Sequence, residues 1–259
     1  MESLKEKTVF ITGASSGIGE SCAHAFAREG CRLLLAARRK ERIDTLSRHL
    51  ADKYAVDTHA VKLDVRDQQE VDDVIRSLPS AWSVIDILVN NAGLSRGLTK
   101  LYEGELRDWE EMVDTNIKGL LYVTRAVLPG MVKRNRGHVI NMGSIAGHQL
   151  YPSGNVYCAT KFAVRGISEG LRMDLLGTDV RVSSVAPGLV QTEFSEVRFR
   201  GDKTRAGQVY AGTLPLKGDD VAEAVIFCAT RPPHVDIAEM IIMPTYQASV
   251  NHVHRVPSP

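Results

Sequence analysis

The sequence is poor in several features that define particular classes of protein. Its 4 cysteines, Cys22, Cys31, Cys158 and Cys228, are scattered with no Cys-x-x-Cys pair, which argues against a disulfide framework or a zinc ribbon. No apolar stretch approaches the roughly 18 residues that a membrane-spanning helix requires, and the charged N-terminus fits neither a signal peptide nor a transit peptide. We therefore expect a protein of a reducing compartment, by default the cytoplasm, with no membrane partner.

Charge of one sign is not in excess either, because 32 Lys plus Arg stand against 31 Asp plus Glu. No global field favours nucleic acid, so any anion must be bound locally. The 8 histidines are dispersed, and His252 with His254 is interpreted as a pair in the tail. A metal hydrolase needs converging His and acidic ligands, so we expect no metal site.

Short β-branched and apolar runs alternate with helical segments along the whole chain. Several runs, such as residues 33–36, are apolar on both faces, as strands buried in a parallel sheet are. This alternation predicts an α/β fold with a doubly wound, mostly parallel seven-stranded sheet, helices on both faces and one domain over residues 1–259. The predicted strands are 9–12, 32–36, 60–64, 85–89, 138–142, 180–185 and 240–243.

Residues 189–219 break this rhythm. They carry many charges and the glycines at 201, 207, 212 and 218, with no clean period. In a compact domain such a stretch suggests a functional lid, and a solvated surface excursion explains the pattern equally well. Residues 245–259 are expected to form a short C-terminal tail.

A glycine-rich turn joins the first predicted strand to the first predicted helix, where residues 12–19 read TGASSGIG. Glycines let backbone amides approach a pyrophosphate, and the helix N-terminus adds partial positive charge. This placement at the first crossover is the context that such a motif needs, so a Rossmann-type nucleotide site is favoured over a plain turn. The predicted contacts are Gly13, Ser15, Ser16, Gly17, Ile18 and Gly19.

The end of the second strand indicates which nucleotide binds. Many Rossmann proteins carry there an acid that selects NAD, but this chain reads Ala37-Arg38-Arg39. A carboxylate would repel a 2′-phosphate, whereas the guanidinium of Arg38, with Arg39 beside it, can bind one. The predicted cofactor is therefore NADP(H). The alternative is a solvated helix start, although the helix dipole disfavours cations there.

Tyr157 and Lys161 lie four residues apart, on one face of a helix that is predicted to begin near Asn155. Free tyrosine titrates near 10, and a nearby cation can lower that pKa by about 1 to 3 units. Spacing alone proves little, because such pairs are common on helix surfaces.

A serine hydrolase is disfavoured, because residues 143–147 have the wrong spacing for a Gly-x-Ser-x-Gly elbow.

Taken together, six features resemble the short-chain dehydrogenase/reductase family in order and approximate spacing, over essentially the whole chain. They are residues 13–19, residues 90–93, Asn116, Ser144, the Tyr157/Lys161 pair and Pro187-Gly188. The resemblance implies that Tyr157 is the general acid in reduction and the base in oxidation, and that Lys161 lowers its pKa and binds the nicotinamide ribose.

The resemblance also implies that Ser144 stabilises the substrate oxygen, and that Asn116 bends its helix and fixes a water relaying protons to Lys161. Without this resemblance, the simplest interpretations are that Ser144 is a turn residue, that Asn116 is an amide on a helix surface, and that Asp64 ends a strand. The further cofactor contacts that it implies are Asp64, Val65, Asn91, Ala92, Gly93, Pro187, Gly188, Val190 and Thr192.

Residues 86–94, 125–132, 193–202 and 251–255 are similar to the NADP-dependent 3-hydroxy acid dehydrogenase subgroup. Its members oxidise serine, allo-threonine and related 3-hydroxy acids, and reduce malonic semialdehyde. A small carboxylate substrate needs a cation or amide donors near Ser144 and Tyr157. The candidates are Arg198, Arg200, Arg96 and Gln149.

Two alternatives to this substrate class stay open. One is a reductase of other small carbonyls or diketones, and the other is a non-catalytic NADP-binding regulator. The intact Ser, Tyr, Lys and Asn set argues against the regulator. The resemblance further implies a homotetramer.

Overall fold

The computed structural model describes residues 2–256, which form an α/β fold around one seven-stranded sheet. The strand order is β3-β2-β1-β4-β5-β6-β7 and every pairing is parallel, which confirms the predicted fold class. The strands are β1 (Thr8–Thr12), β2 (Arg32–Ala37), β3 (Thr58–Lys62), β4 (Ile87–Asn90), β5 (Gly137–Met142), β6 (Val180–Pro187) and β7 (Glu239–Ile242).

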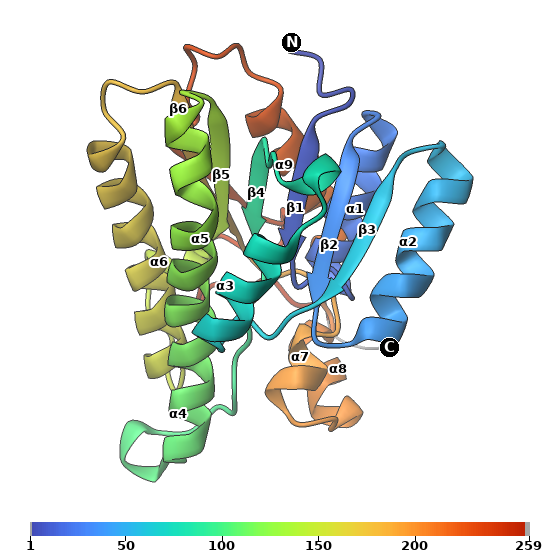
Figure 1. Ribbon diagram of the computed structural model, residues 1–259. Coiled ribbons are helices and arrows are strands. Elements are labelled where there is room, and N and C mark those ends of the chain that lie inside the picture. Colours follow the sequence, from blue (N-terminus) through green and yellow to red (C-terminus); the bar gives the residue numbers. More distant parts are fainter. Residues whose placement is uncertain (1, 257–259) are drawn as a thin grey trace.

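Helices cover both faces of this sheet (Figure 1). Successive strand residues point to opposite faces, so Val9 and Ile11 pack with α1, α2 and α9, while Phe10 packs with α3 and α5. Within residues 2–256, no helix combines the length and apolarity needed to cross a bilayer. The helices are α1 (Gly17–Arg28), α2 (Lys40–Tyr54), α3 (Gln68–Ser77), α4 (Leu106–Val113), α5 (Leu120–Lys133), α6 (Asn155–Asp174), α7 (Phe194–Arg198), α8 (Lys203–Tyr210) and α9 (Gly218–Ala229).

The strand order reverses between β1 and β4. The chain builds the sheet outward through β2 and β3, and then returns to the other side of β1. In open α/β sheets, ligands bind at such a switch point, outside the carboxyl ends of the strands. The fold therefore positions the glycine turn after β1 beside the segment after β4.

The aperiodic segment 189–219 contains the two short helices α7 and α8, which lie beyond the carboxyl edge of the sheet (Figure 1). The tail runs along the same segment. Gln247 Oε1 accepts a hydrogen bond from the Leu189 N–H at 2.7 Å, and the Val256 N–H donates to the Gly212 carbonyl at 2.6 Å. Both ends of this segment are thus tied to the C-terminal tail.

Candidate active site

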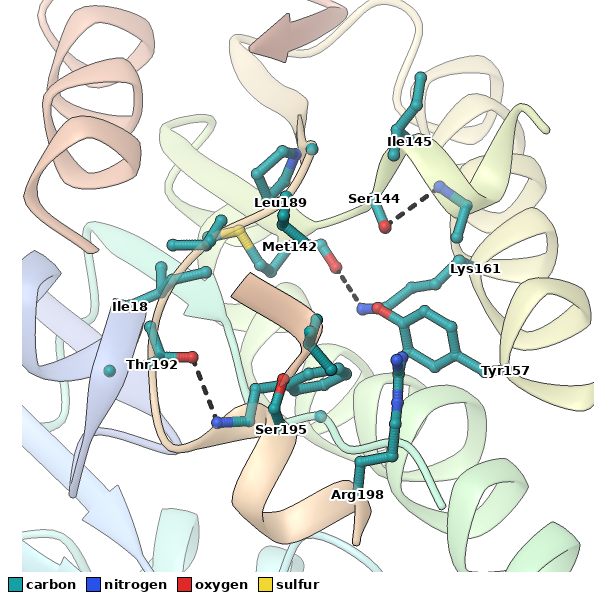
Figure 2. A pocket seen from close by; sticks show the side chains of 18 of the residues that line it. Ile18, Met142, Ser144, Ile145, Tyr157, Lys161, Leu189, Thr192, Ser195 and Arg198 are labelled. Atoms are coloured by element: carbon teal, nitrogen blue, oxygen red, sulfur yellow. Dashed lines mark hydrogen bonds between the residues drawn. The ribbon is translucent and has the colours of Figure 1, made fainter. Parts of the chain in front are cut away.

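A cavity of about 510 Å³ lies at this edge of the sheet. Its wall combines the glycine turn, the ends of β4, β5 and β6, the first turns of α6, helix α7 and the tail. Figure 2 shows Ser144, Tyr157, Lys161 and Arg198 around this space. The fold therefore brings together side chains that are distant in the sequence.

Three of the predicted catalytic side chains line this cavity: Ser144, Tyr157 and Lys161. Tyr157 is 9% exposed and Lys161 is 7% exposed, and both lie in α6, which begins at Asn155 as predicted. The Lys161 Nζ donates to the Met142 carbonyl at 2.8 Å (Figure 2). Ser144 begins a short 3₁₀ turn (Ile145–Gly147), where its Oγ accepts the Ala146 N–H at 3.1 Å.

Asn116 lies just outside this wall, in a π-helical turn (Asp114–Gly119) that separates α4 from α5. Its Oδ1 accepts the Leu94 N–H at 2.8 Å, and its Nδ2 donates to the Leu94 carbonyl at 2.8 Å and to Thr160 Oγ1 at 3.0 Å. Because Asn116 is only 2% exposed, the interpretation as a surface amide is wrong. The helix is distorted into a π-turn at Asn116, while its bend and the water relay stay predictions.

The electrostatics around Tyr157 correct one expectation. We expected Lys161 to lower the pKa of Tyr157, but in this structure burial raises that pKa. The groups that oppose burial are the Arg198 guanidinium and a hydrogen bond with Ser144. The Lys161 ammonium is held at Met142, 6.0 Å from the centre of the Tyr157 ring, and burial lowers its own pKa to about 8.

Arg198 lines the cavity and lies over the Tyr157 ring. Its guanidinium carbon lies 5.5 Å from the centre of the Tyr157 ring and 5.2 Å from that of Phe194, and one terminal nitrogen donates to the Tyr151 hydroxyl at 3.1 Å. The buried Nε has no hydrogen-bond partner within residues 2–256. A buried donor without a partner is costly, and a carboxylate is a strong acceptor for a guanidinium.

The structure does not bring the other three candidates for carboxylate binding into the cavity wall. Arg96 pairs with Glu111 at 2.6 Å and donates to the Val197 carbonyl. Arg200 pairs with Asp108, and Gln149 accepts the Val250 N–H at 2.9 Å. Of the four predicted candidates, Arg198 is the one that lines the cavity.

The glycine turn is built for close approach of the backbone. Gly13 and Gly17 have φ of +66° and +58°, and a Cβ on Gly19 would lie 2.4 Å from Asn91 Nδ2 and 2.5 Å from the Gly13 carbonyl oxygen. Asn91 Nδ2 donates to the Thr12 and Gly13 carbonyls at 3.0 and 3.2 Å. The turn and residues 90–93 are therefore joined into one unit by Asn91.

Most of the predicted cofactor contacts lie in the cavity wall. They are Gly13, Ser16, Gly17, Ile18, Asn91, Ala92, Gly93, Tyr157, Lys161, Pro187, Gly188, Val190 and Thr192. The remaining predicted cofactor contacts lie beside or beyond the cavity wall. Gly19 packs behind the turn, Asp64 forms an ion pair with Arg66 at 2.6 Å, and Val65 packs against Gly119.

At the start of α2, the two predicted arginines differ. Arg38 is exposed, while Arg39 donates to the hydroxyl oxygens of Ser15 and Ser16 at 3.0 and 2.7 Å. The interpretation as a merely solvated helix start is therefore wrong for Arg39.

Sequence reasoning missed several residues of the site. The Thr12 hydroxyl accepts the N–H groups of Asn91 and Ala92, each at 3.1 Å, and joins β1 to β4. Tyr151, Phe194, Gln247 and Arg255 line the cavity. Thr12 could have been identified from the sequence, because it is a polar residue at the end of an apolar strand. The other residues lie in loops and short helices without a recognisable pattern.

A doubly wound sheet with a glycine turn at its switch point, and with Ser, Tyr and Lys side chains around one cavity, defines a class of nucleotide-dependent oxidoreductase. The family model for short chain dehydrogenases matches residues 7–203. The chain therefore belongs to the short-chain dehydrogenase family.

More particular relatives cover nearly the full chain. It is 47% identical over 249 residues to an NADP-dependent 3-hydroxy acid dehydrogenase of Escherichia coli (strain K12), covering 95% of this chain and 99% of that protein. It is 45% identical over 241 residues to sulfoacetaldehyde reductase 2 of Chromohalobacter salexigens, covering 93% and 95%. The solved closed form of a serine dehydrogenase complexed with NADP+ matches with a TM-score of 0.90 and 47% identity, covering 96% of this chain and 100% of that one.

Proposed function

We propose that the protein transfers a hydride between NADP(H) and a small 3-hydroxy acid or its oxo form. The class includes serine, allo-threonine, 3-hydroxypropionate and malonic semialdehyde. The observation that carries this proposal is the guanidinium of Arg198, which lies over the Tyr157 ring in a cavity that Ser144 also lines. The names of the two dehydrogenase relatives support the same chemistry.

The residues around the glycine turn fit NADP(H). Gly13 and Gly17 adopt a positive φ, which lets the chain turn so that backbone amides at the start of α1 can approach a pyrophosphate. Ser15, Arg38 and Arg39 suit a 2′-phosphate. Asp64 and Val65 are proposed to bind the adenine, Lys161 the nicotinamide ribose, and Thr192 with residues 187–190 the nicotinamide. When bound, the cofactor accepts a hydride in oxidation and donates one in reduction.

The side chains of the chain manage the proton and the charges. In oxidation, Tyr157 removes the proton of the substrate hydroxyl, and in reduction it returns a proton to the carbonyl oxygen. Ser144 donates a hydrogen bond to that oxygen and shares the charge developing on it. Arg198 binds the substrate carboxylate and orients the carbon that exchanges the hydride.

A steady-state screen tests this proposal. NADP is combined with L-serine, L-allo-threonine, 3-hydroxyisobutyrate and 3-hydroxypropionate, and NADPH with simple diketones. We expect NADPH to form with the acids, and poor activity with substrates that lack an anionic group. Diketones reduced with a higher kcat/KM than any acid is oxidised would overturn the assignment, and nucleotide binding without any turnover would favour a regulator.

A second candidate substrate is an aldehyde that carries a sulfonate in place of the carboxylate. The relative named sulfoacetaldehyde reductase favours it, because a guanidinium binds either anion through charge-assisted hydrogen bonds. Adding sulfoacetaldehyde and NADPH to the screen separates the two, since a kcat/KM above that for malonic semialdehyde would favour the sulfonate.

We also propose that the protein is a cytoplasmic homotetramer. The four cysteines are free and buried, which suits a reducing compartment. Leu121 on α5, Phe162 on α6 and Ile241 on β7 expose apolar side chains, which a closed symmetric assembly can bury. Light scattering in solution tests the assembly, and the mass of a monomer would contradict it.

A further inference from the structure

A carboxylate at the start of the segment 189–219 reaches across to the arginines of α2. Glu193 Oε2 pairs with an Arg39 terminal nitrogen at 2.9 Å, and Arg42 donates to both Glu193 oxygens at 2.7 and 2.9 Å. Burial acts to raise the pKa of Glu193, but the bonds with Arg39 and Arg42 outweigh it and lower that pKa. Glu193 is therefore ionised at neutral pH and joins the chain after β6 to the chain after β2.

The other edge of Arg39 faces the glycine turn. Its Nε and one terminal nitrogen donate to Ser15 Oγ at 3.1 and 3.0 Å, and that terminal nitrogen donates to Ser16 Oγ at 2.7 Å. Because both hydroxyls accept from Arg39, each keeps its own proton to donate to a further acceptor. Arg39 is thus fixed between Glu193 and the serines proposed to hold the nucleotide.

The charge of this group suits a 2′-phosphate even with Glu193 present. Arg38, Arg39 and Arg42 contribute three positive charges, and Glu193 with the nearby Glu20 two negative charges, which leaves a local charge of about +1. A phosphate monoester carries about −1.5 to −2 at neutral pH. Glu193 therefore orients the arginines without cancelling the field that attracts the phosphate.

Glu193 directly precedes α7, and the last residue of that helix is Arg198. One end of this short helix is thus paired with Arg39 and Arg42, and the other end carries the guanidinium that lies over Tyr157. Thr192, which accepts the Phe194 N–H at 3.2 Å, also packs close to Gly17 of the glycine turn. A shift of α7 at the nucleotide end therefore moves the substrate cation as well.

We propose that Glu193 is a positioning residue that links the 2′-phosphate site to the placement of Arg198 over Tyr157. By this linkage, a phosphate bound at Arg39 holds α7 in place, and the affinity for the acid substrate is higher with NADP than with NAD. The substrate half of the inference, which concerns the affinity for the acid, rests on the proposed function. The nucleotide half, which concerns the binding of NADPH relative to NADH, can be tested without a substrate.

The nucleotide half is tested with Glu193→Gln, and Glu196→Gln is the matched control. Glu196 lies on the same helix and makes no ion pair within residues 2–256. Dissociation constants for NADPH and NADH are measured by nucleotide fluorescence. We expect Glu193→Gln to weaken NADPH binding about fivefold, as the loss of a partly exposed ion-pair network implies, and to leave NADH binding and the control within about twofold.

Two results would overturn this role of Glu193. Unchanged or tighter NADPH binding would mean that the carboxylate competes with the phosphate for the arginines. Equal loss of NADPH and NADH binding would mean that the substitution only loosens the segment. The ratio of the two constants therefore separates positioning from a general structural effect.

The substrate half uses the best acid of the screen. We expect Glu193→Gln to raise its KM several-fold with NADP at nearly constant kcat, and to add no further increase in an Arg198→Ala background, because both changes then act through one group. An unchanged KM in the single variant, or full additivity in the double variant, would overturn the linkage to Arg198. If the wild type oxidises no acid, the proposed function fails, while the ratio of nucleotide constants still decides the role of Glu193.

Discussion

At the scale of single residues, the site depends on how burial and the neighbouring cation of Arg198 act on the pKa of Tyr157. The sequence identified Tyr157, Lys161 and Ser144, because their order and spacing are visible in one dimension. It could not show that Lys161 would point to the Met142 carbonyl, or that Arg198, 41 residues after Tyr157, would lie 5.5 Å from its ring. Distances between side chains on different elements depend on tertiary packing, which spacing does not encode.

Replacing Arg198 with Ala is expected to move the pH dependence of oxidation. Tyr157 must be deprotonated to act as base, and the cation of Arg198 lowers its pKa against the effect of burial. Without that cation the pKa of Tyr157 rises, so the increase of kcat/KM with pH moves to higher pH. Arg198→Lys keeps the charge and should shift this pH profile less. A pH profile of kcat/KM that does not move in Arg198→Ala would contradict this role of Arg198.

Lys161 is expected to lower the stability of the fold at neutral pH. Burial lowers its pKa from 10.5 to about 8, so the unfolded chain binds more protons than the folded one between these values. Stability therefore rises as the pH increases from about 8 to 10.5, by roughly 3 kcal/mol at most. The free energy of unfolding of Lys161→Met, measured with denaturant, should lack this rise with pH. The same pH dependence of that free energy in variant and wild type would be evidence against the role of Lys161.

At the scale of elements, the apolar runs were sufficient to locate every strand within about two residues. Strand β3, for example, was predicted at 60–64 and spans Thr58–Lys62. Asp67 caps α3, since its Oδ1 accepts the Glu70 N–H at 3.0 Å, while Glu70 Oε2 accepts the Asp64 N–H at 3.2 Å. Helices α7 and α8 were not predicted, because elements of 5 and 8 residues are too short to show a helical period.

The first turn of α1 supplies a sharp test of backbone approach. Gly19→Ala would place a Cβ 2.5 Å from the Gly13 carbonyl oxygen, so we expect a loss of stability of about 1 to 3 kcal/mol and weaker NADPH binding. Gly207→Ala in α8 is the matched control, because a Cβ there meets nothing within 4 Å, and it should stabilise by about 1 kcal/mol at most. Equal stability of the two variants would refute the contact.

At the scale of the whole molecule, the cavity is assembled from segments that span nearly the full sequence, from Gly13 to Arg255. The parallel sheet gathers the ends of its strands at one edge, which the alternation of elements predicted. The contribution of the tail was not predicted. A stretch without periodic pattern gives no sign of which surface it will cover.

The tail is expected to hold the segment 189–219 over the cavity. Arg255 donates to the Val209 carbonyl at 3.1 Å and to the Ala211 carbonyl near the end of α8. Arg255→Ala should raise the KM for the acid about two- to tenfold, as the loss of one or two hydrogen bonds implies. If the variant keeps the wild-type KM, the tail does not hold this segment.

The most direct measurement compares turnover and nucleotide binding in wild type and Tyr157→Phe. The ring of Phe keeps the packing of Tyr157 against Phe194, whose ring centre lies 5.6 Å away, and removes only the hydroxyl that transfers the proton. We expect kcat with the best 3-hydroxy acid and NADP to fall by about 10²- to 10⁴-fold, while the dissociation constant for NADPH stays within about twofold of wild type. Turnover by Tyr157→Phe near the wild-type rate would show that another group carries the proton, and the account would be wrong.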